Sequence, residues 1–214
     1  MTLEKSFPAM GTVHTITIFD AEGPGAAGDA RAYMMALNRA WTCFETDSLV
    51  SRIDRAAGEA PVPVDRDTFE VLRQARHYSE LTDGAFDVSV GPLADLWRGA
   101  IREKRLPNDE DVWNALELVD WHDIELDEGT SSVRLRRAGM RIDLGAIAKG
   151  YAVDSLKERL RARGVRRALL DLGGTVATMG CQLPVGVLKS FGACECTCVC
   201  IHTSIRTERE DAMS

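Results

Sequence analysis

The chain has 214 residues, of which 45% are hydrophobic and 28% are charged, so it can bury the core of one domain or of one and a half. Its formal net charge of −7 argues against binding to nucleic acid or to an anionic membrane, because either would require a basic face toward the phosphates. No segment approaches the roughly 18 continuous apolar residues of a membrane span.

The first half of the chain is predicted to form one strand and then several helices. Residues 13–19 alternate β-branched and polar side chains, which is typical of a strand with one buried face. The Gly/Pro-rich stretch 21–28 predicts a break, after which Asp29 is expected to cap a core-facing helix that ends near Trp41. The pattern further predicts a helical turn near 49–53, a loop at 58–63, a helix over 67–81, an extended segment at 86–92, a short helix over 92–97 and a polar surface segment with a helical patch over 106–123.

The clearest pattern in the second half is a strand, a glycine turn, a helix and another strand. Strands over 132–135 and 140–144 are expected to form a hairpin. The second of them leads through Asp143 into a helix over 147–163, and a buried strand over 167–172 follows. Together, these elements indicate an α/β (α+β) fold.

A carboxylate, small residues and a lysine lie together where the strand at 140–144 gives way to the helix. After Asp143 the sequence reads Leu-Gly-Ala-Ile-Ala and then Lys149. The free N–H groups of a helix start favour an anion such as a pyrophosphate, and the lysine adds positive charge. The alternative is an ordinary strand-to-helix connection, since the spacing matches neither a P-loop nor the dinucleotide-binding fingerprint.

Two further groups of residues have both a ligand-binding and a structural interpretation. Phe86 can flank a planar ring and Asp87 can accept hydrogen bonds from a ribose or an adenine, but a core phenylalanine and a turn-capping aspartate are equally plausible. Met10 and Phe44 offer apolar contacts that suit an isoalloxazine ring, although such residues more often fill the core.

Five motifs acquire a more specific meaning when they are taken in order along the chain. They are Met10-Gly11-Thr12; Asp47-Ser48 with Ser51-Arg52; Gly84-Ala85-Phe86-Asp87 with Gly91-Pro92-Leu93 and Leu96-Trp97; Asp143 to Gly150 with Tyr151-Ala152-Val153-Asp154; and Gly173-Gly174. Over about residues 7–180 this series resembles the ApbE family of FAD:protein FMN transferases. The resemblance implies a mixed sheet flanked by helices, with an ApbE-like domain over residues 1–180.

The resemblance also implies an activity and a set of site residues. FMN would pass from FAD to a Thr or Ser hydroxyl of an acceptor protein that carries a Ser/Thr-Gly-Ala-Thr motif, with Mg²⁺ bound and AMP released. FAD contacts are expected from Met10, Phe44, Ala85, Phe86, Asp87, Asp143 and Lys149, and the carbonyl of Ala146 is expected to bind Mg²⁺. The family usually has tyrosine where Phe44 stands.

The last part of the chain, 181–214, departs from the family's pattern. Family members carry an acidic residue after Gly-Gly, then a His-x-x-Asp-Pro-x-Thr-Gly motif and an Ala-Asp-x-x-x-Thr stretch. Here Thr175 replaces the acidic residue and neither motif occurs, so no catalytic residue is assigned. Two alternative functions therefore stay open, a catalytically impaired FAD-binding remnant and an FAD pyrophosphatase that yields FMN and AMP.

The same segment holds five of the six cysteines of the chain. The five are Cys181, Cys194, Cys196, Cys198 and Cys200. We expect an unstructured tail or an altered end rather than a metal site, because zinc ligands usually come in separated pairs.

The N-terminus lacks a signal-peptide pattern, which predicts a cytoplasmic protein for the sequence as written, although family members are often exported lipoproteins.

Overall fold

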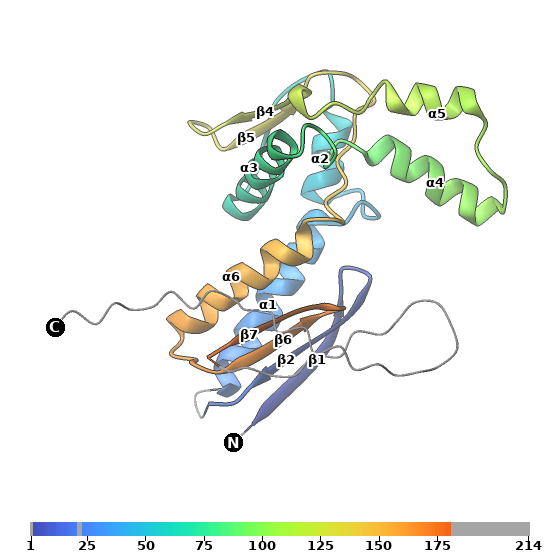
Figure 1. The fold of residues 1–214 in the computed structure, drawn as a ribbon. Helices are drawn as coiled ribbons and strands as arrows, with labels where there is room; N and C mark the ends of the chain where they lie inside the picture. Colours follow the sequence, from blue (N-terminus) through green and yellow to red (C-terminus); the bar gives the residue numbers. More distant parts are fainter. Residues whose placement is uncertain (1, 21–22, 181–214) are drawn as a thin grey trace.

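The computed structural model describes residues 2–20 and 23–180 and confirms the predicted α/β class (Figure 1). Both sheets are antiparallel, and helices flank them. None of the helices in these residues is long and apolar enough to cross a membrane. The predictions for the cysteine-rich segment 181–214 lie outside the described residues.

A four-stranded sheet forms one layer of the fold. Its strands, in the order β1-β2-β6-β7, are β1 (Leu3–Ala9), β2 (Thr12–Ile18), β6 (Ala168–Leu172) and β7 (Thr175–Met179). His14, Ile16 and Ile18 alternate toward the buried face of β2, as the sequence predicts. Opposite them, Ala168 and Leu172 of β6 are also fully buried.

Two long helices cover one face of this sheet and lie side by side (Figure 1). Helix α1 (Gly23–Trp41) packs against β1 and β2, and helix α6 (Ala148–Ala162) packs against β6 and β7. Ala152, Leu156 and Leu160 of α6 are buried at a spacing of four residues, which places them on one face of the helix. The predicted helix over 147–163 and the predicted strand over 167–172 are therefore confirmed.

The remaining elements form a second layer above these helices in Figure 1. They are α2 (Leu49–Arg55), β3 (Val62–Pro63), α3 (Arg66–Leu81), α4 (Gly91–Glu103), α5 (Asp109–Leu116), the 3-10 turn Trp121–Asp123, β4 (Ile124–Asp127) and β5 (Ser132–Leu135). A small sheet has the order β3-β5-β4, and α4 packs against α5 as a two-helix arm that extends away from the body. The core runs continuously from the large sheet to α2 and α3.

The predicted hairpin between 132–135 and 140–144 is wrong. Strand β5 instead pairs with β4, and Asp127 holds the turn between them because its carboxylate accepts hydrogen bonds from the N–H of Gly129 and the hydroxyl of Thr130. Residues 140–144 have the inward-outward alternation of a strand, but Arg141 forms only an isolated parallel bridge, with Val90. Alternating burial therefore occurs here without a partner strand.

Three other boundaries differ from prediction. Helix α1 begins at Gly23, inside the stretch expected to be broken, because a proline in the first helical turn removes an N–H that has no intrahelical partner. Residues 86–90 form turns rather than an extended segment, and α4 continues to Glu103 instead of ending at Trp97. Strands β1 and β7 were not predicted.

One carboxylate ties three helices together in the centre of the fold. Asp67 of α3 accepts hydrogen bonds of 2.9 Å from the hydroxyls of Tyr33 on α1 and Tyr151 on α6. Arg159 lies 3.5 Å from the same carboxylate, and its guanidinium carbon is 3.7 Å from the centre of the Tyr33 ring. Burial and the hydrogen bond to Asp67 raise the pKa of Tyr33 to about 12, so this hydroxyl stays a donor.

We expect the substitution Asp67→Ala to lower the free energy of unfolding by about 2 kcal/mol, because both tyrosine hydroxyls lose a charged acceptor. Urea denaturation at neutral pH measures this change. The matched control is Glu70→Ala on the same helix, where the carboxylate forms a surface pair with Arg73 and removal should change stability by less than about 1 kcal/mol. Equal losses in the two variants would contradict the role of Asp67.

Candidate functional site

Two of the five motifs lie side by side in the structure. The N–H of Asp143 donates to the carbonyl of Val88 at 2.8 Å, and the N–H of Gly91 donates to the carbonyl of Arg141 at 3.2 Å. Gly91 is required at this contact, since an added Cβ would lie 2.6 Å from the Arg141 carbonyl oxygen. The segment that precedes α4 and the segment that leads into α6 are thereby held together.

Asp143 is a predicted site residue whose carboxylate is held on both oxygens. Its Oδ1 accepts a 2.8 Å hydrogen bond from the N–H of Gly145, and its Oδ2 accepts one of 2.9 Å from Nη1 of Arg98. The side chain is one-fifth exposed, so the carboxylate is reachable from outside while it is fixed on two sides. Its surroundings allow it to accept a further hydrogen bond from a ligand.

Arg98 continues into a chain of alternating charges that sequence reasoning missed. Its Nη2 donates to Asp95 at 2.6 Å, Asp95 also pairs with Arg141, and Nε of Arg141 lies 3.4 Å from Asp54. With Asp143 at the other end, these groups join α2, α4 and the segment before α6. The only local signal is the three-residue spacing of Asp95 and Arg98 within one helix.

Asp54 is the most strongly perturbed acid of this chain of charges. Its side chain is 7% exposed, and its Oδ1 accepts a 2.9 Å hydrogen bond from the N–H of Ile142. Burial raises the pKa of Asp54 to about 6, although the hydrogen bond from Ile142 and the charge of Arg141 oppose the change. Asp54 therefore loses its proton near pH 6, above the range of an ordinary aspartate.

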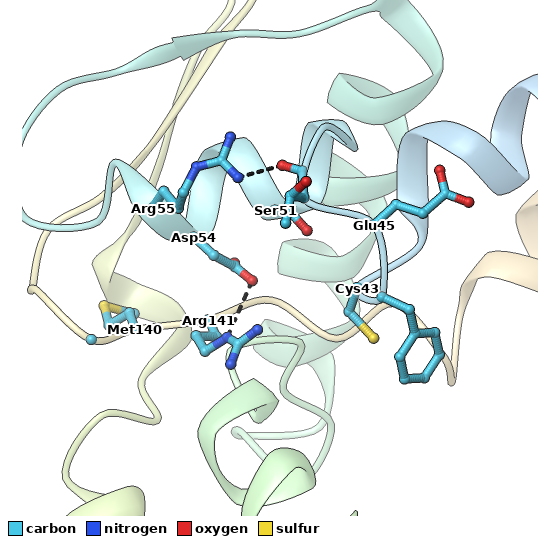
Figure 2. A pocket seen from close by; sticks show the side chains of 10 residues that line it. Cys43, Glu45, Ser51, Asp54, Arg55, Met140 and Arg141 are labelled. Atoms are coloured by element: carbon cyan, nitrogen blue, oxygen red, sulfur yellow. Dashed lines mark hydrogen bonds and ion pairs between the residues drawn. The ribbon is translucent and has the colours of Figure 1, made fainter.

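A pocket of about 330 Å³ opens beside this chain of charges (Figure 2). Figure 2 shows Asp54 pointing from α2 toward Arg141, with Cys43 and Glu45 of the loop after α1 on the opposite side. Phe44 also lines the pocket, and with an exposure of 82% its ring is available for stacking. The guanidinium carbon of Arg98 lies 5.9 Å from the centre of that ring.

The structure gives the motif Gly84-Ala85-Phe86-Asp87 mainly internal contacts. The carboxylate of Asp87 accepts hydrogen bonds from the N–H and the hydroxyl of Ser89, and from the N–H of Trp121 at 3.0 Å. Phe86 is partly buried and packs edge-on against Tyr78. Ala85 is exposed. Phe86 thus packs against other side chains and Asp87 caps a turn, which is the structural alternative that the sequence left open. Their role toward FAD stays a prediction.

Met10 lies in the turn between β1 and β2, in a backbone conformation with a φ of 48°. Its N–H donates to the side-chain oxygen of Asn38 at 2.6 Å, which fixes the turn against α1. Met10, Thr12 and Asn38 line a second, shallower hollow. The thioether is partly buried against the core, so its proposed contact with a flavin is untested.

Lys149 lies in the first turn of α6, where no side chain caps the helix. Its positive charge reaches His14 on β2, which is fully buried and has no hydrogen-bond partner on either ring nitrogen among the described residues. Burial and Lys149 lower the pKa of His14, so the imidazole is neutral at pH 7. Sequence reasoning missed His14, although an ionisable residue at an inward position of an alternating strand is a usable signal.

The predicted Mg²⁺ ligand, Ala146, has no cluster of acidic side chains around it among the described residues. Over 2–20 and 23–180, no three side chains of His, Cys, Asp or Glu lie close enough together to hold a metal ion. Ala146 is exposed, and its carbonyl is of the oxygen type that Mg²⁺ prefers. The nearest acid in sequence, Asp143, is already bonded to Arg98 and Gly145. Ala146 therefore remains a predicted ligand.

Comparison with known proteins decides the family. The model of the ApbE family matches residues 10–207. This chain belongs to the ApbE family. The family resemblance noted in the sequence is thereby confirmed, while the roles of the individual residues are not tested by the match.

Curated relatives of this chain are named FAD:protein FMN transferase, and two of them illustrate the similarity. The protein from Klebsiella pneumoniae is 39% identical over 158 residues, which is 74% of this chain and 48% of the relative. The protein from Treponema pallidum is 35% identical over 152 residues, which is 69% of this chain and 41% of the relative. The chain spans about half the length of the curated relatives it matches.

The fold is also that of solved ApbE structures. The crystal structure of the ApbE protein from Thermotoga maritima has a TM-score of 0.80 and 28% identity, and it covers 90% of this chain and 65% of its own. The apo form of the flavinyl transferase ApbE from Pseudomonas stutzeri has a TM-score of 0.74 and 26% identity, over 83% of this chain and 58% of its own. The predicted ApbE-like fold is confirmed.

Proposed function

We propose that this chain binds FAD and forms part of an enzyme that transfers FMN from FAD to a Thr or Ser hydroxyl of an acceptor protein. The observation that supports this proposal is that Phe44, which lines the pocket, and Asp143, which lies about 100 residues later in the chain, both lie against the guanidinium of Arg98. Phe44 offers an exposed ring for the flavin, and Asp143 offers a fixed carboxylate for its polar groups.

The start of α6 supports a further part of the proposal, namely that this helix binds the pyrophosphate of FAD. The helix has no side-chain cap, and Lys149 lies in its first turn. The N–H groups of Ile147 and Ala148 already donate to the carbonyl of Leu144. The N–H groups that follow in the first turn, together with the helix dipole, favour an anion. A pyrophosphate near Ala146 would leave the flavin end of FAD free to extend toward Asp143 and the Phe44 ring.

The proposed reaction exchanges one phosphorus–oxygen bond for another. The acceptor hydroxyl oxygen forms a bond to the FMN phosphorus, the bond from that phosphorus to the bridging oxygen breaks, and AMP leaves with that oxygen. The hydroxyl proton passes to a base that we do not assign. The family resemblance extends the proposal to an acceptor motif of the Ser/Thr-Gly-Ala-Thr type and to Mg²⁺, for which the Ala146 carbonyl is one proposed ligand and would help to neutralise phosphate charge.

We expect Asp143→Asn to weaken FAD binding by about tenfold to 100-fold, because it removes a charged acceptor while it preserves side-chain volume. Quenching of FAD fluorescence measures the affinity. The control is Glu158→Gln on α6, an exposed residue outside the five motifs, so this variant should bind FAD as the unmodified protein does. Unchanged affinity in Asp143→Asn would count against the site.

Incubation of the protein with FAD, Mg²⁺ and an acceptor that carries the motif tests the whole proposal. A fluorescent flavinylated acceptor together with AMP is the expected result. Release of FMN and AMP without labelled acceptor would favour the pyrophosphatase alternative, and quenching of FAD fluorescence without AMP would favour the FAD-binding remnant. Failure to bind FAD would refute all three.

A further inference from the structure

We infer that Arg98 is a positioning residue for FAD, which acts through Asp143 and the Phe44 ring rather than by contact with the reacting phosphorus. This inference rests on the proposed function. It concerns a residue outside the motifs that carry the family resemblance, since Arg98 follows Leu96-Trp97 and belongs to none of them.

The geometry of Arg98 is that of a fork between two carboxylates. Nη1 donates to Asp143 at 2.9 Å and Nη2 donates to Asp95 at 2.6 Å. A guanidinium is planar and presents its donors at fixed angles, so two bonds from its two terminal nitrogens define its orientation. Asp143 receives this donor on the oxygen that Gly145 does not use.

The same guanidinium lies against the ring that is proposed to stack on the flavin. Its central carbon is 5.9 Å from the centre of the Phe44 ring, within the range of a cation–π contact. Phe44 is 82% exposed and, as a phenylalanine, has no hydroxyl that could orient it through a hydrogen bond. Arg98 is therefore the described contact that can hold this exposed ring in place.

Arg98 is itself held before any ligand arrives. Asp95 pairs with Arg141 as well as with Arg98, and Arg141 pairs with the buried Asp54. The guanidinium of Arg98 is thus linked to α2 through Asp95, Arg141 and Asp54. Burial of α4 in the core does not explain the fixed position of Arg98, because Gly91 is the one buried residue of that helix.

The consequence is that loss of Arg98 loosens two groups at once. Without its partner, the Asp143 carboxylate keeps only the N–H of Gly145 among the described contacts, and the Phe44 ring loses its cation. FAD would then have to order both groups when it binds, which lowers affinity because side-chain freedom is lost at that step. Arg98 and Asp143 should therefore be coupled energetically.

The test compares Arg98→Met and Arg98→Lys by quenching of FAD fluorescence. We expect Arg98→Met to weaken FAD binding by about tenfold, the size of one charge-assisted interaction. Arg98→Lys should recover part of this loss, because an ammonium can still pair with one carboxylate but cannot bridge two. Arg102→Met, which removes a charge from the same helix at an exposed position, is the control and should bind FAD normally.

A double-mutant cycle separates positioning from a general effect on the fold. Arg98→Met combined with Asp143→Asn should weaken FAD binding by less than the product of the two separate losses, because Arg98 acts in part through Asp143. Asp95→Asn provides a second variant that loosens Arg98 without removing it, and it should reduce affinity by a smaller factor. Thermal unfolding without FAD reports whether each variant is folded.

Two results would overturn the inference. One is normal FAD affinity in both Arg98→Met and Asp95→Asn. The other is losses from Arg98→Met and Asp143→Asn that multiply fully in the double variant. Both results require an unmodified protein that binds FAD, so they differ from failure of the proposed function, in which the unmodified protein itself does not bind.

Discussion

Gly91→Ala is expected to lower the free energy of unfolding by about 3 kcal/mol or more, which is at the upper end of the effects of single substitutions. An added Cβ would lie 2.6 Å from the carbonyl oxygen and 2.7 Å from the carbonyl carbon of Arg141. Both atoms belong to the backbone, so no side-chain rotation relieves the overlap. The segment before α4 would have to move away from the segment before α6, which breaks the N–H to carbonyl bond between Gly91 and Arg141.

The matched control for this variant lies in the same helix. Gly99 also belongs to α4, but an added Cβ there meets no atom within 4 Å. Gly99→Ala should therefore stabilise the protein by about 0.5–1 kcal/mol through helix propensity. Urea denaturation of the two variants at pH 7.5 measures the difference, and similar stabilities would show that the close approach at Gly91 is relaxed in solution.

Asp54→Asn is expected to change how stability depends on pH. The pKa of Asp54 is raised from 3.8 to about 6 in the folded protein, mainly by burial. Between these two values the folded protein holds a proton that the unfolded chain has released. The stabilising contribution of the protonated carboxyl is therefore fully present below about pH 3.8 and is lost as the pH rises through 6.

The size of this effect follows from the shift of about two pKa units, which corresponds to about 3 kcal/mol. Relative to Asp54→Asn, the unmodified protein should lose about this much stability between pH 4 and pH 7.5. His14 acts in the opposite direction, because its lowered pKa makes stability increase with pH. Since His14 is present in both proteins, its contribution cancels in the comparison. The measurement is urea denaturation at several pH values, and a constant difference across the range would refute the raised pKa.

The sequence predicted the elements whose burial pattern is strong and local. Strand β2 and helix α6 were predicted within about two residues, since their apolar residues repeat at the period of a strand and of a helix. Strand β1 was missed because Pro8 and charged residues interrupt it, and only Phe7 and Ala9 are buried. Such a pattern is typical of an edge strand.

The error in the hairpin has a different cause. Met140, Ile142 and Leu144 are all buried at 4% exposure or less, so the alternation that the sequence displays is real. Alternation reports which side chains face the core, but it does not report which backbone lies alongside. Two backbone hydrogen bonds join this segment to Val88, in the connection after α3, and to Gly91, at the start of α4, and neither residue belongs to a strand.

The candidate site was predictable only as far as its local motifs. Phe44 and Asp143 were assigned through the family resemblance, and the structure brings them to one guanidinium. Arg98, Asp95 and Asp54 were missed because the chain of charges joins positions far apart in the sequence, and a single charged residue on a helix resembles any solvated residue. Only a fold that brings α2, α4 and the segment before α6 together reveals their pairing.

The order of the strands in the large sheet bears on how the protein folds. Strands β1 and β2 are neighbours in the chain and can pair as soon as they are synthesised, but Ile18 of β2 pairs with Ala168 of β6, about 150 residues later. Closing so long a loop is slow, and the free edge of β2 stays exposed meanwhile. During translation, the N-terminal hairpin must therefore wait for most of the described chain before its sheet can be completed.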